Sequence, residues 1–303
     1  MDGKLYGIPT DVNVHVLIYR RDLIPNPPET IDEMVEIARK FTRKFNPNSP
    51  TEYGYIVSGK TSLYNAMLWE SLMASAGGTP FELGRELEAV ENLTKPAAKK
   101  ALEVYVNFIK EGISPPDSIT YEYAEANAAF QAGEAAMYIQ WNAAIRELRD
   151  KEKSPLVWNE VGIAPIPGIR PISVIPTLTV LHRSRAHYLG FSINKASLHK
   201  KEAFKFLAYL TTTRAMLDYL KNGGLPPMRS IFVNPEAQAI RTELPELDII
   251  MAKYAYPATT HPEVFTIYDI LVKHISAAWS GVIGVDEALS NAQKELRELL
   301  RKK

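Results

Sequence analysis

The most constraining feature of the sequence is the run VHVLIY at positions 14–19. Val14, Val16 and Ile18 would share one face of an extended segment, and the residues between them are also largely apolar. Such a run is typical of a strand in the middle of a sheet that is covered on both sides. A central strand needs a neighbour on each side, and the short segment before it cannot supply a sheet. The run therefore predicts a sheet whose other strands come from elsewhere in the protein.

The rest of the chain alternates helix and strand patterns. Thr30, with Glu33 three residues later, predicts a capping box at a helix start, and Gly77 permits the left-handed end of another helix. The expected helices cover residues 31–45, 64–75, 96–111, 122–132, 199–221, 235–254, 262–279 and 285–301. The expected strands cover residues 53–57, 135–139 and a long β-like stretch between 161 and 194. This alternation predicts an α/β architecture.

Composition narrows the class of protein. The 303 residues include 35 basic and 35 acidic side chains, and this zero net charge argues against a nucleic-acid partner. The length favours two domains, at ~150 residues each. The absence of cysteine excludes disulfides and thiol catalysis. No apolar run reaches the ~18 residues of a membrane span, and no signal peptide is present, so either the protein is cytoplasmic or its targeting segment is absent from this chain.

Catalytic and metal-binding signatures are weak. The sequence has no nucleophile elbow, phosphate loop, zincin motif or dinucleotide fingerprint. His182 and His187 are too loosely spaced, without paired carboxylates, to indicate a zinc site. A glycosidase needs two carboxylates across a cleft, and Asp11, Glu70 and Asp269 are available in number, although their mutual placement is not set by the sequence. No metal and no cofactor are expected.

Aromatic residues give more information. The chain has 15 Tyr, 10 Phe and 4 Trp. Five of them fall near the ends of expected elements, where a ring can face a cleft: Tyr64, Trp69, Trp141, Tyr188 and Tyr268. Flat rings beside Asn, Asp and Glu suit a sugar, because its C–H faces pack on aromatics while its hydroxyls take hydrogen bonds. The same positions also suit half-buried packing residues.

Four motifs carry a family resemblance. They are DGKLYGIPTDVNVHVLIYRRDLIPNPPETIDEMVEIARKF at residues 2–41, AGG at 76–78, NAAFQAGEAAMYIQW at 127–141 and SGVIGVDEALSNAQKEL at 280–296. In this order they resemble the extracellular solute-binding proteins of ABC sugar transporters, in the maltose/maltodextrin-binding branch. The resemblance covers essentially the whole chain.

The resemblance implies a periplasmic-binding-protein-like fold in which two α/β lobes, with mixed sheets flanked by helices, close on a ligand. Lobe 1 would comprise residues 1–10 and 159–232, and lobe 2 residues 11–158 and 233–303. The chain would lack the signal peptide and the first part of the N-terminal lobe. The protein would be no enzyme, but would deliver a sugar or oligosaccharide to membrane permease subunits. Its place would be extracellular or periplasmic, free or anchored to the membrane in the full-length protein.

The resemblance also assigns ligand-binding positions. Asn13 falls where the branch carries a ligand-binding Glu, with Asp11 as its near neighbour. Trp141 matches the stacking Trp, although the usual Gly-Pro before it is missing. The remaining expected ligand contacts are Tyr64, Trp69 and Glu70 in one helix, Tyr188, Arg229 and Tyr268.

Two alternatives stay open beside the sugar-binding interpretation. The same fold could bind another solute, such as a phosphorylated polyol or a peptide. A phosphate would need convergent basic groups, and near the inferred cleft only Arg229 and Lys60 are candidates, so sugar is favoured. The other alternative is a glycoside hydrolase, which would release reducing ends from oligosaccharides; a remnant without function is a further hypothesis.

Overall fold

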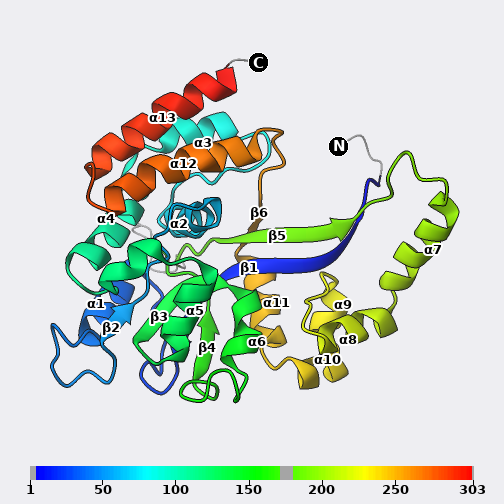
Figure 1. Cartoon of the computed structure of the whole chain (residues 1–303), viewed down its shortest axis with the longest axis horizontal. Coiled ribbons are helices and arrows are strands. Elements are labelled where there is room, and N and C mark those ends of the chain that lie inside the picture. Colours follow the sequence, from blue (N-terminus) through cyan, green and yellow to red (C-terminus); the bar gives the residue numbers. More distant parts are fainter. Residues whose placement is uncertain (1–4, 171–179, 302–303) are drawn as a thin grey trace. The chain divides into compact units, whose positions relative to one another are not determined.

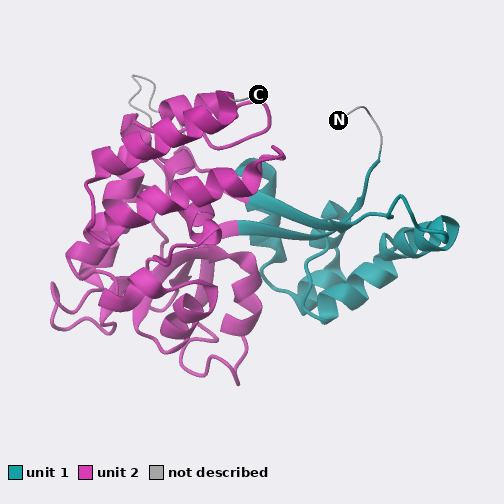
Figure 2. Cartoon of the chain, turned by 45° about the horizontal axis from the view of Figure 1, so that its top comes forward, with its two compact units in different colours: residues 1–14, 186–255 teal, residues 15–185, 256–303 magenta. Residues whose placement is uncertain are grey.

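The computed structural model describes residues 5–170 and 180–301, and the chain divides into two compact units (Figure 2). Unit 1 consists of residues 1–14 and 186–255, and unit 2 of residues 15–185 and 256–303. The chain therefore passes from one unit to the other three times, between residues 14 and 15, 185 and 186, and 255 and 256. Strands and helices alternate along the chain, so the predicted α/β class is confirmed.

The sheet of unit 2 is built around β1 (Ile8–Arg20). From His15 onward β1 pairs antiparallel with β3 (Ala135–Trp141), and from Leu17 onward also with β4 (Val161–Ala164). β2 (Tyr53–Tyr55) extends this sheet parallel to β3. Val16, Leu17 and Ile18 have no exposed surface. The expectation that VHVLIY is a central, covered strand is confirmed.

Helices cover the sheet of unit 2 (Figure 1). They are α1 (Ile31–Lys40), α2 (Leu63–Ser75), α3 (Glu86–Asn92), α4 (Pro96–Lys110), α5 (Tyr123–Gln131), α6 (Ile145–Leu148), α12 (Val264–Trp279) and α13 (Val285–Arg301), with 3₁₀ turns at Pro116–Thr120 and Asn142–Ala144. The capping box predicted at Thr30 and Glu33 is present, each side chain bonding the other's backbone N–H at 3.2 Å. Gly77 ends α2 at φ +89°, as its sequence position indicated.

Helix α2 is the central helix of unit 2. It packs against α4 and α12, and every residue from Asn65 to Ser75 is buried. A helix covered on all sides can be apolar all round. Its few polar side chains must then find partners inside the protein.

Unit 1 combines a two-stranded ribbon with short helices. Residues Ile8–Val14 of β1 pair antiparallel with β5 (Ser184–Phe191), with a register shift between Pro9 and Asp11. A Cβ at Gly190 would lie 2.6 Å from the carbonyl oxygen of Ile8, so this close approach requires glycine. The helices are α7 (Lys200–Leu210), α8 (Thr213–Lys221), α9 (Arg229–Phe232), α10 (Pro235–Ile240) and α11 (Leu244–Lys253), and β6 (Ala255–Pro257) leads into unit 2.

The units divide the chain at other places than the expected lobes. Residues 159–170 were expected in lobe 1, but β4 belongs to unit 2 because it pairs with β1 there. Residues 233–255 were expected in lobe 2, but α10 and α11 belong to unit 1 because they pack against α8 and α9. The expected helices 199–221 and 235–254 are each two helices. Most of the β-like segment 172–181 lies outside the described residues.

Among the residues that the structure describes, no helix is both long and apolar enough to span a bilayer.

Four buried tyrosines lead us to expect that the protein loses stability at alkaline pH. Burial is the main cause that raises the pKa of Tyr55, Tyr138, Tyr256 and Tyr268 well above the usual value. The unfolded chain releases these protons near pH ~10, whereas the folded chain retains them. The unfolded state then binds fewer protons, so the free energy of unfolding decreases as the pH rises above that value.

We therefore expect phenolate absorbance of these tyrosines to appear together with the loss of circular dichroism in an alkaline titration. Full ionisation of all tyrosines in a protein that keeps its dichroism would contradict this expectation.

Candidate functional site

Trp141 is the aromatic residue that best fits a ligand platform in unit 2. It is the last residue of β3, where the buried AAMYI segment ends and a 3₁₀ turn begins, and its side chain is half-buried. It lies directly opposite His15 in the β1–β3 pairing. The two ring centroids are 3.8 Å apart at an interplanar angle of 74°. A large ring that is held on one side and reaches the surface on the other can stack on a ligand.

Tyr64 is an exposed aromatic residue of unit 2 that was also expected to contact the ligand. It lies in the first turn of α2 and is 55% exposed. A polar cluster adjoins this helix start, because Glu122 accepts hydrogen bonds from Lys60 Nζ and from Ser62 Oγ, both at 2.8 Å. The hydrogen bond from Lys60 is the main cause that lowers the pKa of Glu122. Lys60 is therefore already paired with a carboxylate.

Three expected ligand residues lie instead in the core of unit 2. Trp69, Glu70 and Tyr268 have no exposed surface. Trp69 and Glu70 are on the all-buried helix α2, and Tyr268 is on α12, which packs against it. A side chain without exposed surface offers nothing to a solute in this structure, so the burial of these three residues favours a structural role, and their ligand role stays a prediction.

The buried carboxylate of Glu70 is fully engaged. It accepts hydrogen bonds from Arg185 Nη1 at 2.8 Å, from the Tyr268 hydroxyl at 2.5 Å and from the Phe81 backbone N–H at 2.9 Å. Burial alone would lower the pKa of Arg185, but Tyr268 and Glu70 outweigh burial and raise it, so the guanidinium stays charged. Sequence reasoning missed Arg185, because this partner is 115 residues away from Glu70.

Next to Glu70, Ser71 joins three segments that lead toward unit 1. Its Oγ is 2.7 Å from His15 Nδ1, accepts a hydrogen bond from the Arg185 backbone N–H at 3.2 Å and lies 3.5 Å from the Tyr256 hydroxyl. His15, Arg185 and Tyr256 are the terminal residues of unit 2 at its three chain crossings. His15 and Ser71 were not expected from the sequence, although a histidine within an apolar strand was the available signal.

In unit 1, Asp11 holds a loop. Its carboxylate accepts hydrogen bonds from the Tyr219 hydroxyl at 2.9 Å and from the Leu225 backbone N–H at 3.1 Å. Burial, followed by the hydrogen bond to Asp11, raises the pKa of Tyr219 to about 12. Leu225 O also accepts from Val12 N–H at 2.9 Å. These contacts give both oxygens of Asp11 a structural role.

Asn13 and Tyr188 do not share a face of the β1–β5 ribbon. Asn13 pairs with His187, whereas Tyr188 pairs with Val12, the neighbour of Asn13. Directly opposed residues lie on the same face and successive residues on opposite faces. Asn13 is half-buried and Tyr188 is 50% exposed. Because their side chains point to opposite faces of this ribbon, they do not line one ligand pocket within it.

Arg229 is a surface residue at the start of α9. Its side chain is 76% exposed and its Nε lies 3.2 Å from Asp248 Oδ1 on α11. The guanidinium is therefore paired with a carboxylate of the same unit, and nothing else in its surroundings indicates a ligand role.

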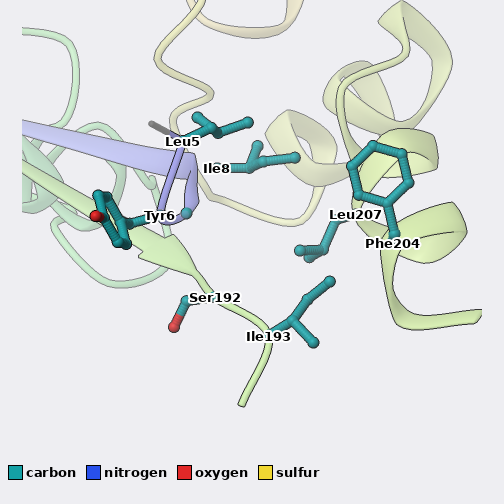
Figure 3. A pocket seen from close by; sticks show the side chains of 8 residues that line it. Leu5, Tyr6, Ile8, Ser192, Ile193, Phe204 and Leu207 are labelled. Carbon is teal, nitrogen blue, oxygen red and sulfur yellow. The ribbon is translucent and has the colours of Figure 1, made fainter. Parts of the chain in front are cut away.

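A hollow of about 230 Å³ lies in unit 1 and is lined by none of the predicted site residues. Figure 3 shows Leu5, Ile8, Ile193, Phe204 and Leu207 around it. Tyr6 and Ser192 also line this largely apolar hollow and contribute two hydroxyl groups. A sugar site needs several convergent hydrogen-bonding groups, so this hollow does not suit a sugar. Within residues 5–170 and 180–301, no group of three His, Asp or Glu residues could hold a metal ion.

Comparisons with known proteins agree with the fold. A model of the family described as bacterial extracellular solute-binding proteins matches residues 1–245. A putative binding protein of Brucella abortus is 22% identical over 314 residues, which cover all of this chain and 69% of that protein.

Solved structures are similar over almost the whole chain. Maltose-bound MalE3 of T. maritima has a TM-score of 0.82 and 24% identity, with 99% of this chain and 74% of that chain covered. A solute-binding protein of Agrobacterium radiobacter K84 in complex with ribitol has a TM-score of 0.80 and 24% identity, with 99% and 72% covered. One of Agrobacterium vitis S4 with bound D-mannitol has a TM-score of 0.78 and 25% identity, with 100% and 74% covered.

Proposed function

Because the chain belongs to the bacterial extracellular solute-binding proteins, we propose that it captures a sugar, sugar alcohol or oligosaccharide for an ABC transporter. The observation that carries the proposal is the half-buried ring of Trp141 at the end of β3, on a scaffold that resembles proteins solved with maltose, ribitol and D-mannitol. An aromatic face packs well against the C–H face of such a ligand.

The proposed ligand set is smaller than the one expected from the sequence. In unit 2 it comprises Trp141 and Tyr64, which both combine accessible surface with an aromatic ring. Within unit 1, Asn13 is a separate candidate, because its half-buried side chain carries an amide. An amide can donate and accept hydrogen bonds, as sugar hydroxyls do. Asp11, Trp69, Glu70 and Tyr268 support the scaffold, and Tyr188 and Arg229 are left outside the set.

The family description also supports a proposal for the partners and the location. The protein works outside the cytoplasmic membrane, as the family description indicates, and transfers its ligand to permease subunits in the membrane. Its role is binding and release without a chemical step on the ligand.

The alternatives find less support in the local contacts. To bind the phosphate of a phosphorylated solute, Lys60 would have to break its ion pair with Glu122, and Arg229 its ion pair with Asp248. For a glycoside hydrolase, Glu70 is buried in an ion pair and Asp11 holds a loop. A hydrolase needs one carboxyl group free to donate a proton and a second free to act as base or nucleophile. Release of reducing ends from oligosaccharides would nevertheless decide for that alternative.

Replacing Trp141 by Ala tests the proposal directly. We expect weaker binding of the best ligand among maltose, D-mannitol and ribitol by about 1–3 kcal/mol, the scale of removing an aromatic anchor. Titration calorimetry measures this change.

The matched control for Trp141 is Trp158→Ala, because Trp158 is a surface tryptophan of the same unit, 37% exposed and covered by Lys151. This control should bind like the parent protein. Unchanged affinity in Trp141→Ala would remove Trp141 from the site.

A further inference from the structure

His15 and Trp141 form a cross-strand pair of rings in unit 2. They are directly opposed in the antiparallel β1–β3 pairing. The centroid distance of 3.8 Å and the angle of 74° describe an edge-on contact. Directly opposed side chains are the closest neighbours on a sheet face. The Trp141 ring also packs against the core of unit 2, and the edge of the imidazole is the contact that meets it across the strand pair.

The imidazole of His15 is hydrogen-bonded to a side chain of helix α2. His15 has no exposed surface, and its Nδ1 is 2.7 Å from Ser71 Oγ. Ser71 is also fully buried and is bonded by the Arg185 backbone N–H at 3.2 Å. An apolar ring at position 15 could pack against Trp141, but it could not form the hydrogen bond that fixes the plane of the imidazole.

From this geometry we propose that His15, anchored by Ser71, is a positioning residue that fixes the ring of Trp141 for ligand stacking. The role in stacking rests on the proposed function of Trp141, whereas the ring orientation itself does not. A Trp ring that is already ordered loses less rotational freedom when a ligand binds. Releasing it should therefore weaken binding about two- to tenfold.

The first measurement is ligand-independent. The near-ultraviolet circular dichroism of Trp141 is obtained as the difference between a protein and its Trp141→Phe counterpart. We expect Ser71→Ala and His15→Leu to reduce this difference strongly, because a mobile indole gives little dichroism.

The control variant is Ser75→Ala. Ser75 is also buried in α2, one turn further on, and exchanges hydrogen bonds of 2.9 and 2.8 Å with the backbone of Arg183 without contacting His15. It should leave the Trp141 signal unchanged. If His15→Leu does not fold, Ser71→Ala alone decides, and an undiminished Trp141 signal in a folded Ser71→Ala protein would overturn the proposal.

The second measurement is affinity for maltose, D-mannitol and ribitol in a coupled set of variants. Ser71→Ala should weaken binding in the parent protein but have no effect in a Trp141→Ala background, since it acts through that ring. If Ser71→Ala weakened binding equally in the parent protein and in the Trp141→Ala protein, the proposal that it acts through Trp141 would be overturned. If none of the three ligands binds, the proposed function fails for them, while the dichroism still decides whether His15 and Ser71 order the ring.

Discussion

Arg185→Met is expected to lower the free energy of unfolding by about 3–5 kcal/mol, the cost of breaking a buried ion pair by removing one partner. The side chains of Arg185 and Glu70 are 1% and 0% exposed, respectively. Without the guanidinium, the carboxylate of Glu70 would remain buried with only the hydroxyl of Tyr268 and the N–H of Phe81 as donors. Denaturant unfolding measures the loss.

Two companion variants test the cause of that loss. Arg229→Met removes a guanidinium that is 76% exposed, and exposed ion pairs contribute only about 0–1 kcal/mol. Adding Glu70→Gln to Arg185→Met should recover part of the stability, because the amide carries no charge. Its oxygen can still accept from the Phe81 N–H, and its NH2 group can donate to the Tyr268 hydroxyl oxygen, which bonded the other carboxylate oxygen of Glu70. No recovery in the double variant would show that an uncompensated charge is not the reason for the loss.

Trp69→Ala is expected to destabilise the protein by about 3–5 kcal/mol, the usual range for emptying a buried aromatic site. Trp69 has no exposed surface and belongs to the main core of unit 2. Thermal and denaturant unfolding measure the stability loss, and titration with the best-binding ligand at low temperature measures affinity in the protein that remains folded.

Comparing Trp69→Ala with Trp141→Ala distinguishes a residue of the hydrophobic core from a residue of the ligand site. We expect the first to change stability with little change in affinity, and the second to change affinity with a smaller change in stability. A Trp69→Ala protein that is as stable as its parent but binds weakly would restore the ligand role that the sequence suggested for Trp69.

The sequence by itself determined those strands and helix ends that depend on residues close together in the chain. The two apolar faces of residues 14–19 were sufficient for a central strand, and Thr30 with Glu33 was sufficient for a helix start. The order of motifs also pointed to the family that the comparisons found. Helices 199–221 and 235–254 were predicted as single helices because their apolar spacing continues across the breaks at Thr211–Thr212 and at residues 241–243.

Tertiary structure decided which of the candidate side chains reach solvent. Helix α2 is apolar on all sides, so periodicity could not tell that Trp69 is enclosed while Tyr64, five residues earlier, is exposed. The role of Glu70 required Arg185, which is distant in sequence. The register of β1 with β5 places Asn13 and Tyr188 on opposite faces of the ribbon. The register of β1 with β3 places His15 directly opposite Trp141. Burial, ion pairing and register all depend on contacts between distant segments, whereas composition and spacing describe only neighbours along the chain.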